Sequence, residues 1–426
     1  MAERVCIVGL GYVGLPLALR CAEKGLDVHG FDVSESIVKA LNNGKSHIKD
    51  DALEKKAAQL KGKIFASSDE KVLAKAETIV VCVPTPVDEK HLPDLSFVES
   101  ACKAVAKSLR KGMLVVVEST VSPGTVRGVC LPLLEKSGLK AGKDFFLAHC
   151  PERIDPGNKK WPVEKIPRVL GGISEQCAGK AKAFYGKIID AEIVVLNSVE
   201  AAEAVKITEN TFRDINIAFV NELARSFDKL GIDVKEVIKG ASTKPFGYMP
   251  FYPGPGVGGH CIFCDPYYLI ETAKNKGFEH KFLLLAREIN NSMPAFVFEK
   301  TAEALAASGK KLEGSKIALL GLAYKPDVDD LRESPSLKIL ELLKKGKANV
   351  RVFDPFIPSK SNVGSLNDAI KGADAIVLAT NHSVFIEALS PKKLKAAGIS
   401  VVVDARNALD KEGIVSEGIT FRGIGR

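Results

Sequence analysis

Short apolar runs alternate with longer amphipathic segments over the first part of the chain. Four of these runs have the length and the β-branched content of buried strands, at 5–8, 27–31, 78–83 and 113–118. Strands that alternate with helices form a parallel sheet, because each crossover helix returns the chain to the same edge. The pattern therefore predicts a doubly wound α/β domain at the N-terminus.

The same order of runs recurs near the C-terminus, at 316–321, 349–354, 373–380 and 400–405. Between the two copies, residues 199–230 contain neither proline nor glycine and carry apolar side chains at helical spacing, which predicts one long helix. We therefore expect an α/β fold with two Rossmann-like doubly wound parallel-sheet domains joined by a long central helix. The expected division is 1–198, 199–308 and 309–426.

A glycine-rich turn follows the first strand of the N-terminal copy, and Asp32 ends the second strand. Glycine lets the backbone approach a pyrophosphate at a helix N-terminus, and the carboxylate accepts hydrogen bonds from ribose hydroxyls. A glycine turn without a ligand is the alternative, but strand, helix and acid all occur at the required spacing. Because Asp32 would repel a 2′-phosphate, we expect NAD rather than NADP. The residues of the turn are Gly9, Gly11, Tyr12, Val13 and Gly14.

The corresponding turn of the C-terminal copy reads GLAYKPD and lacks these glycines. It carries Lys325, and Arg332 follows shortly after. Open α/β sheets bind ligands at the C-terminal ends of their strands, where Lys325 lies. This position favours an anionic ligand other than a dinucleotide over a solvated surface lysine.

On the predicted central helix, Lys206, Asn210 and Arg213 fall at i, i+4 and i+7 and share one face. Such a stripe is usually solvated surface. An asparagine in mid-helix lowers helix propensity, however, and a lysine beside it could reach a ligand if this face turns toward a cleft.

Composition and charge limit the class of protein. The chain has 426 residues, 46% hydrophobic and 26% charged, which suits two or three globular domains. Its net charge of +8 is spread along the sequence, which favours anionic small molecules over nucleic acid. No run is long enough to span a membrane, and the N-terminus lacks a signal-peptide pattern. We therefore expect a cytoplasmic protein that binds neither nucleic acid nor a membrane.

One of the nine cysteines, Cys261, stands out because it follows Gly258 and Gly259 in a glycine-rich loop. The count is odd and no secretory segment is visible, so reduced thiols are expected. Cys261 and Cys264 form a single CxxC, and we favour no metal over half a zinc site or a redox pair. A thiol nucleophile combined with a redox cofactor indicates that an aldehyde is held on sulfur between two oxidations. A buried inert thiol is the alternative, but this loop lacks apolar neighbours.

Seven motifs, in order along nearly the whole chain, resemble the nucleotide-sugar 6-dehydrogenase family, relatives of UDP-glucose dehydrogenase. They are GLGYVGLPLA (9–18), VPTP (83–86), EST (118–120), PERIDPG (151–157), ENTFRDINIAFVNELA (209–224), FYPGPGVGGHC (251–261) and GLAYKPDVDDLRESPS (321–336). The resemblance implies NAD in the N-terminal domain, UDP in the C-terminal domain and a homodimer or higher homo-oligomer formed through the central helix. It also implies oxidation of the C6 hydroxymethyl of a UDP-sugar to a carboxylate, with two NAD reduced.

The substrate branch follows from two of these motifs. PERIDPG and FYPGPGVGGHC are more similar to the branch that acts on UDP-N-acetylhexosamines than to the UDP-glucose branch, which tends to read NPEFL. The expected substrate is UDP-N-acetylglucosamine, with UDP-N-acetylmannosamine and UDP-glucose as alternatives. The chain departs from the family pattern at Phe263 and Cys264, where a proline is common, and at Lys244, where some members have arginine. A two-electron hydroxyacid dehydrogenase and a non-catalytic dinucleotide sensor would both leave Cys261 unexplained.

By motif position, the resemblance also implies roles for single residues. Lys206 with Asn210 would assist proton loss from the C6 oxygen and stabilise the oxyanions, and a nearby ammonium would favour the thiolate of Cys261. Glu152 is the expected base for thioester hydrolysis, with Thr120 and Asp265 as further candidates. The structural alternatives are a loop carboxylate for Glu152, a strand-end cap for Thr120 and an N-cap for Asp265, before a helix beginning near Pro266.

The remaining assignments concern binding. Gly256, Gly258 and Gly259 would let the loop backbone lie against the sugar. Further cofactor contacts are expected from Pro84, Thr85, Thr120 and Arg332. Substrate contacts are expected from Glu152, Arg153, Lys206, Asn210, Arg213, Phe251, Tyr252, Gly256, Gly258, Gly259 and Lys325.

Overall fold

The computed structural model describes residues 2–88, 92–154 and 160–426. The chain forms two compact units, each described by itself below. The first consists of Met1–Glu209 and Tyr267–Phe278, and the second of Asn210–Pro266 and Glu279–Arg426.

A sheet of eight described strands forms the centre of the first unit, in the order β3-β2-β1-β4-β5-β6-β7-β8. Its neighbours run parallel except β6 and β7, which are antiparallel with Ala148 opposite Gly172 and His149 opposite Gly171. The strands are β1 (Arg4–Val8), β2 (Asp27–Phe31), β3 (Ile64–Ser67), β4 (Thr78–Val81), β5 (Leu114–Val117), β6 (Phe146–His149), β7 (Arg168–Gly172) and β8 (Ile193–Val195).

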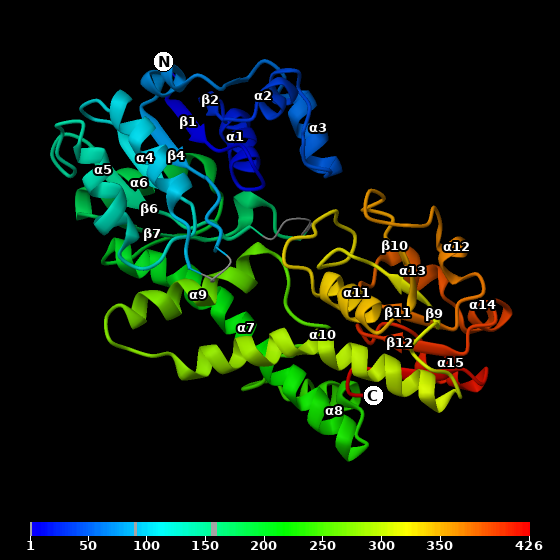
Figure 1. Cartoon of the computed structure of the whole chain (residues 1–426). Helices are drawn as coiled ribbons and strands as arrows, with labels where there is room; N and C mark the ends of the chain where they lie inside the picture. The colour runs from blue at the N-terminus through cyan, green and yellow to red at the C-terminus, as the bar shows by residue number, and fades with distance from the viewer. Residues whose placement is uncertain (1, 89–91, 155–159) are drawn as a thin grey trace. The chain divides into compact units, whose positions relative to one another are not determined.

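Helices cover both faces of this sheet (Figure 1). They are α1 (Gly14–Glu23), α2 (Glu35–Asn42), α3 (Asp51–Gln59), α4 (Ser96–Ser108), α5 (Leu131–Glu135) and α6 (Glu175–Ile188), with the 3₁₀ helices η1 (Glu70–Lys75) and η3 (Val163–Lys165) and the π-helix η2 (Val126–Cys130). Because both faces are covered, all four residues of β4 and of β5 are buried, and they are apolar apart from Thr78. Two apolar cores result, one for each face.

The second unit contains a smaller sheet of five described strands in the order β10-β9-β11-β12-β13, all parallel. The strands are β9 (Lys316–Leu320), β10 (Asn349–Phe353), β11 (Ala375–Leu378), β12 (Val401–Asp404) and β13 (Thr420–Gly423). The helices are α8 (Val234–Ala241), α10 (Lys281–Ala307), α11 (Pro335–Lys345), α12 (Leu366–Ile370), α13 (Ser383–Ala388), α14 (Pro391–Ala396) and α15 (Lys411–Ser416). Apolar cores again lie on both faces of the sheet.

Two helices, α7 (Val199–Leu230) and α9 (His260–Lys274), pass from one unit into the other. The bounds of α7 are those that the sequence predicts, and the predicted strands occur within about two residues of their expected ends. The expected fold class is therefore confirmed. The division into parts ending at residues 198 and 308 stays a prediction.

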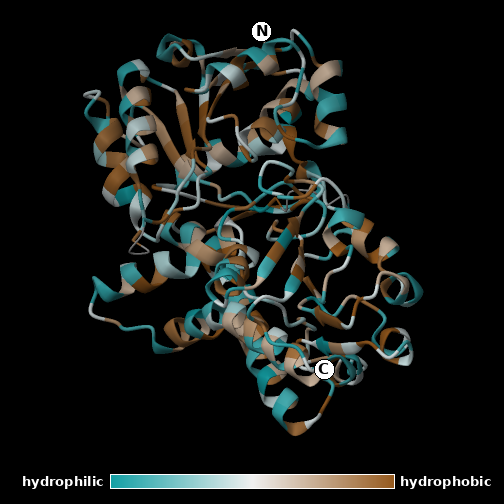
Figure 2. Cartoon of the chain, turned by 45° about the vertical axis from the view of Figure 1, so that its right-hand side comes forward, coloured by the Kyte–Doolittle hydropathy of each residue, from teal (hydrophilic) through white to brown (hydrophobic). Residues whose placement is uncertain are grey.

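The hydropathy of the residues follows this architecture: Figure 2 shows hydrophobic residues along the strands of each sheet and mixed colouring on the surrounding helices. None of the helices in the described ranges has both the length and the apolar content needed to cross a membrane.

Candidate active-site residues

The turn from β1 into α1 contains three glycines, and the surroundings of each give a different reason why glycine occupies that position. A Cβ on Gly14 would lie 1.8 Å from the carbonyl oxygen of Gly9, and a Cβ on Gly9 would lie 2.7 Å from that of Cys82, so both are required by packing. A Cβ on Gly11 would have no described atom within 4 Å. Gly11 therefore faces open space just before α1, where a pyrophosphate approaches the backbone of such a turn.

Asp32, at the end of β2, is oriented by two backbone amides. Its Oδ2 accepts a hydrogen bond from the amide of Leu10 at 2.8 Å, and its Oδ1 accepts one from Ser34 at 2.9 Å. The carboxylate is half-buried, and its other lone pairs can accept hydrogen bonds from ribose hydroxyls. The open glycine, the start of α1 and this acid fit NAD. Tyr12 is exposed and Val13 half-buried in the same turn.

Thr85 and Thr120 follow the C-terminal ends of the adjacent parallel strands β4 and β5. The carbonyl of buried Thr85 accepts a hydrogen bond from the Tyr268 hydroxyl at 2.8 Å, while Pro84 is exposed. Thr120 is half-buried. Both threonines thus lie at the sheet edge where open α/β sheets bind their ligands.

Glu152 follows β6 and is only 5% exposed. Its Oε2 accepts a hydrogen bond from Nη1 of Arg168 at 2.6 Å, and its Oε1 accepts from the amides of Arg153 and Ile154 at 2.6 and 2.7 Å. One cation and two amides of its own loop therefore hold the carboxylate in a fixed orientation. Residues 155–157 of the PERIDPG motif lie outside the described residues.

Three fully buried residues that the sequence analysis missed surround this carboxylate. Arg168 opens β7, Glu118 follows β5 and Tyr185 lies on α6. Arg168 Nη1 is 3.8 Å from Glu118 Oε1, which accepts a hydrogen bond from the Tyr185 hydroxyl at 2.5 Å. Burial raises the pKa of Glu118 to about 8; the charge of Arg168 opposes this rise and that of Glu152 adds to it. The only sequence signal is a charged residue at the end of an apolar run, as in LVVVE.

Lys206 and Arg153, two expected substrate contacts, belong to the first unit. Lys206 is buried in α7, at 9% exposure. Arg153 forms an ion pair with Glu209 at 2.6 Å and donates to the carbonyl of Pro167 at 2.9 Å. Arg153 is therefore already held by the chain, and its predicted contact with substrate stays a prediction.

In the second unit, Asn210 and Asp265 form a buried pair. Nδ2 of Asn210 donates to Oδ2 of Asp265 at 2.5 Å. The structural alternative for Asp265, an N-cap of a helix beginning near Pro266, does not hold, because α9 already begins at His260 and contains both residues. The catalytic role of Asp265 stays a prediction. Pro266 lies inside the helix, where its missing N–H removes one hydrogen bond without ending the helix.

Cys261 is exposed in the first turn of α9, whereas the eight other cysteines are buried. Before it, the amide of Gly259 donates to the carbonyl of Arg332 at 2.9 Å. The guanidinium of Arg332 binds Asp330 through Nε at 3.0 Å and Nη2 at 2.6 Å. This hydrogen bonding raises the pKa of Arg332 against the effect of burial, with further contributions from the charges of Asp330 and Cys261. Arg332 therefore lies within electrostatic reach of the thiol.

The glycines before Cys261 are required by the chain's own packing. A Cβ on Gly258 or on Gly259 would lie 2.7 Å from Tyr324, and Gly259 has a φ of +80°. A Cβ on Gly256, at φ +128°, would lie 3.0 Å from the carbonyl oxygen of Asn290. Close approach to neighbouring residues explains these glycines. The predicted approach of a sugar to the same backbone stays a prediction.

A buried amide network, also missed in the sequence, holds the start of this loop. Asn221 Oδ1 accepts from the amide of Gly254 at 2.9 Å, and its Nδ2 donates to Asn290 at 2.9 Å. Asn290 in turn donates to Asp214 Oδ1 at 2.8 Å. Asp214 and Asn221 fall at i+4 and i+11 from Asn210 on α7, so their helical spacing was the available signal.

The other residues with an expected substrate role are more exposed. Arg213 and Tyr252 are exposed, and Lys325 is half-buried. Phe251 packs edge-on against Phe212, with ring centroids 5.9 Å apart. Their assignments to the substrate stay predictions.

The second unit repeats the hydrogen bonds of the N-terminal turn. Asp354 follows β10 as Asp32 follows β2, and its Oδ2 accepts from the amide of Leu322 at 2.6 Å, as Asp32 does from Leu10. Its Oδ1 accepts from the amide two residues on, Phe356, at 2.8 Å. The two copies therefore agree down to single hydrogen bonds.

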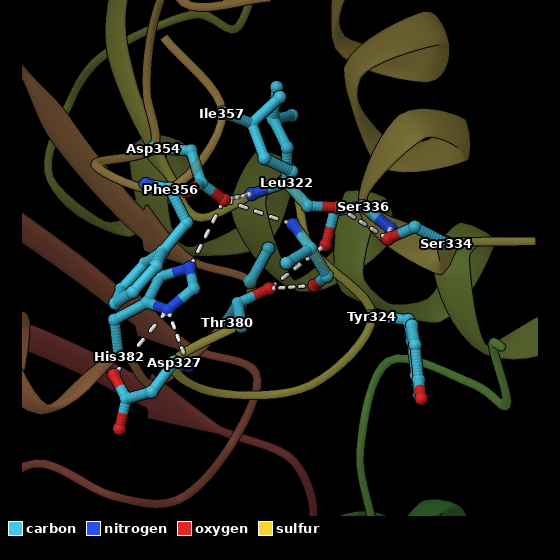
Figure 3. Close-up of polar contacts among 12 residues, drawn as sticks. Leu322, Tyr324, Asp327, Ser334, Ser336, Asp354, Phe356, Ile357, Thr380 and His382 are labelled. Carbon is cyan, nitrogen blue, oxygen red and sulfur yellow. Dashed lines mark hydrogen bonds and ion pairs between the residues drawn. The ribbon is translucent and has the colours of Figure 1, made fainter. Parts of the chain in front are cut away.

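The two acids differ in their surroundings, and Figure 3 shows those of Asp354. Asp354 is completely buried, and its Oδ2 lies 3.1 Å from Nε2 of His382, whose ring stacks on Phe356. The amide of Asp327 donates to Nδ1 of His382 at 2.9 Å, so the proton of a neutral ring lies on Nε2 and is donated to Asp354. This carboxylate is enclosed by its partners Leu322, Ala323 and His382, whereas that of Asp32 is half-buried.

Known proteins match this chain over almost its whole length. A UDP-N-acetyl-D-mannosamine dehydrogenase from Pyrococcus horikoshii is 37% identical over 425 residues, which cover 99% of each chain. A UDP-N-acetyl-D-glucosamine 6-dehydrogenase from Pseudomonas aeruginosa is 38% identical over 419 residues, 96% of this chain and 98% of that protein. A solved UDP-D-ManNAc dehydrogenase from Pyrococcus horikoshii is similar with a TM-score of 0.93 at 37% identity, over 100% of this chain and 99% of that one.

Three models of one family match in order along the sequence. The NAD binding domain of the UDP-glucose/GDP-mannose dehydrogenase family matches residues 3–189, its central domain 200–292 and its UDP binding domain 318–411. The expected cofactor and the expected resemblance are thereby confirmed. The chain belongs to the UDP-glucose/GDP-mannose dehydrogenase family.

Proposed function

We propose that this chain oxidises the C6 hydroxymethyl of a UDP-N-acetylhexosamine to a carboxylate, in two successive oxidations that use NAD. The observation that carries the proposal is the thiol of Cys261. It is exposed at the start of α9, after a glycine loop, while every other cysteine is buried. A nucleophilic sulfur serves an enzyme that must retain an aldehyde until its second oxidation.

The NAD would be held by the turn at Gly9–Gly14 and by Asp32, with Pro84, Thr85, Thr120 and Arg332 as further contacts. When bound, it supplies the acceptor for the hydride that leaves C6, and the reaction consumes two such cofactors. The UDP would be held by the second α/β copy through Lys325. We also propose the three-part division at 1–198, 199–308 and 309–426.

The first steps use Lys206, Asn210 and Cys261. As C6 loses a hydride, its hydroxyl proton leaves toward Lys206 or a water held by it, and the aldehyde forms. The thiolate of Cys261 then adds to the carbonyl carbon, and the resulting oxyanion is stabilised by Lys206 and Asn210 until it takes a proton. The product of this addition is a thiohemiacetal.

The last steps form and break a thioester. Loss of a second hydride from C6, with the proton of its hydroxyl, converts the thiohemiacetal to a thioester. Glu152 takes a proton from water, which attacks the thioester carbon; the carbon–sulfur bond breaks, the thiolate leaves and a carboxylic acid forms and ionises. Thr120 and Asp265 are proposed to orient this water.

Two epimers are the main candidates for the substrate. Relatives named for UDP-N-acetyl-D-mannosamine and for UDP-N-acetyl-D-glucosamine are about equally identical to the chain, at 37% and 38%. We retain UDP-N-acetylglucosamine as the first candidate on its motifs, and UDP-N-acetylmannosamine and UDP-glucose as alternatives. Initial rates of NADH formation with each sugar, measured at equal concentration, will rank them.

The test counts NADH per sugar and then removes the thiol. Wild-type enzyme is expected to form two NADH per sugar, and Cys261→Ser to lose full oxidation. Cys264→Ser is the matched control, because Cys264 belongs to the same CxxC but is buried. One NADH per sugar, or normal acid formation by Cys261→Ser, would refute the proposal. Gel filtration with light scattering tests the expected homodimer.

A further inference from the structure

Two carboxyl groups and one guanidinium share a buried site in the first unit. Glu118, Arg168 and Glu152 are 1%, 0% and 5% exposed. If all three were ionised, the group would carry a net negative charge in a low-dielectric interior. A buried charge without a partner is costly, so one carboxyl group is expected to hold a proton.

The contacts decide which carboxyl group is the ionised one. Arg168 is 2.6 Å from Glu152 but 3.8 Å from Glu118, and Glu152 also accepts hydrogen bonds from two backbone amides. Glu118 receives the Tyr185 hydroxyl at 2.5 Å and the weak donor Cys82 Sγ at 3.8 Å. Strong donors and the closer cation thus stabilise the charge on Glu152, and the proton belongs on Glu118.

We propose that Arg168 and Glu118 are positioning residues: Arg168 fixes the orientation of Glu152, and Glu118 carries the proton that lets Glu152 remain an ionised base. The inference rests on the proposed role of Glu152 in thioester hydrolysis. Neither residue touches the substrate in this scheme. Tyr185 completes the cluster, since its hydroxyl donates to Glu118 and its ring lies 5.8 Å from the Arg168 guanidinium.

The contacts of Glu152 fix its orientation. Arg168 and the amides of Arg153 and Ile154 donate to its two oxygens, and the Glu118 side chain is a further hydrogen-bond partner. A protonated Glu118 can donate to Glu152, so its proton stabilises the ionised form of Glu152. A carboxylate that is fixed and ionised is suited to accept a proton from a water molecule placed against it. Misplacement by about 1 Å would cost roughly 100-fold in such a step.

The proton on Glu118 gives a distinctive pH dependence. Burial raises its pKa to about 8, so the proton is lost above that pH. The second negative charge would then compete with Glu152 for Arg168. The charged groups that face Glu118 are Arg168 and Glu152, and the Tyr185 hydroxyl and the Cys82 thiol form hydrogen bonds with it. The buried thiols of Cys21 and Cys150 also lie within electrostatic reach of Glu118. We expect wild-type kcat to fall above about pH 8, with little change in KM.

The experiment measures kcat, KM and intact mass after rapid quenching with UDP-N-acetylglucosamine or UDP-N-acetylmannosamine and NAD. Arg168→Lys keeps the charge but loses the planar guanidinium, whose Nη1 contacts Glu152 and which lies 5.8 Å from the Tyr185 ring, so kcat should fall about 100-fold while a thioester adduct accumulates on Cys261. Glu118→Gln keeps a neutral side chain of the same shape, so it should retain kcat at pH 7 and lose the decline above pH 8. Tyr185→Phe should shift that decline to another pH.

Controls separate this inference from folding and from the proposed function. Arg20→Lys alters another buried arginine of the first unit, paired with Glu23 and Asp190 at 2.6 Å each, and should produce no adduct. Glu152→Gln should accumulate the adduct; if it does not, the proposed function fails. If Glu152→Gln accumulates the adduct while Glu118→Gln keeps the alkaline decline and Arg168→Lys turns over without an adduct, the positioning roles are wrong. If Arg168→Lys does not fold, the pH profile of Glu118→Gln alone decides.

Discussion

The two copies of the glycine turn provide a matched pair of substitutions, Asp32→Asn and Asp354→Asn. Asparagine keeps the size of aspartate but replaces one acceptor oxygen with a donor amide. At Asp354, the oxygen Oδ2 accepts hydrogen bonds from Leu322, Ala323 and His382, and Oδ1 accepts from Phe356. The asparagine carbonyl will therefore take the Oδ2 position, and its NH₂ group will face the amide of Phe356.

The magnitude follows from burial. Leaving the Phe356 amide without an acceptor costs about 1–3 kcal/mol, and exchanging charge-assisted hydrogen bonds for neutral ones costs roughly 1 kcal/mol more. Because Asp354 is completely buried, water cannot replace these bonds. We therefore expect a loss of about 3 kcal/mol. At the half-buried Asp32, where water can satisfy Leu10 and Ser34, the loss should be about 1 kcal/mol.

Hydrogen–deuterium exchange with mass spectrometry can measure both losses in their own segments. A loss of 3 kcal/mol corresponds to roughly a 100-fold lower protection of the amides around Leu322 in Asp354→Asn, and a loss of 1 kcal/mol to about fivefold around Leu10 in Asp32→Asn. In addition to this smaller loss of protection, Asp32→Asn should weaken NAD binding in a titration. If Asp32→Asn lost as much protection around Leu10 as Asp354→Asn loses around Leu322, or more, the argument that enclosure by His382 makes the Asp354 substitution more costly would be refuted.

The pH dependence of this protection provides an independent check. Burial raises the pKa of Asp354, but the hydrogen bonds from His382 and from the amides of Leu322 and Ala323 outweigh it, and the net pKa is below the ordinary value. A lowered folded-state pKa stabilises the fold fully above the unfolded value of about 4 and loses that contribution as pH falls through the folded value. Protection around Leu322 should therefore decrease below about pH 4 in the wild type more steeply than in Asp354→Asn.

Other substitutions test the NAD turn and the proposed chemistry. Gly14→Ala places a Cβ 1.8 Å from the Gly9 carbonyl oxygen and should destabilise the first unit by about 3 kcal/mol or more, measured by thermal unfolding. Gly11→Ala meets no described atom within 4 Å, so it should fold normally but bind NAD about tenfold more weakly; unchanged affinity would exclude Gly11 from the NAD site. Lys206→Ala should lower kcat by roughly 100-fold or more with NAD affinity unchanged, and normal turnover would remove Lys206 from the mechanism.

The sequence predicted those parts of the fold that depend on local patterns. The bounds of α7 follow from an uninterrupted helical period, and β4 and β5 follow from runs of β-branched residues buried on both sides. The alternative role of Asp265 as an N-cap failed because a proline normally indicates the start of a helix, whereas Pro266 lies inside α9. Sequence rules based on neighbouring residues do not reveal that α9 has already begun directly after the glycine loop, at His260.

Long-range polar partners could not be predicted from spacing. Glu118, Arg168 and Tyr185 come from β5, β7 and α6, and the pairing of His382 with Asp354 joins two strand ends of the second sheet. In one sequence each of these is an isolated polar residue. Only folding brings them into contact, so the predicted Glu152 was found without the residues that orient it.

Near one edge of the larger sheet, β7 and β8 run opposite to the other strands, and this reversal places the first residue of β7 at the rim where those other strands end. In the strands that share one direction, the first residue lies at the rim opposite to the C-terminal strand ends, where open α/β sheets bind their ligands. Strand β7 runs against β6, and extending their register from His149 and Gly171 sets Glu152 across from the first residue of β7. The direction of β7 thus allows its first residue, Arg168, to meet Glu152. If every strand of the sheet ran in one direction, that first residue would lie at the opposite rim, and an arginine beside Glu152 would have to come from another position in the chain.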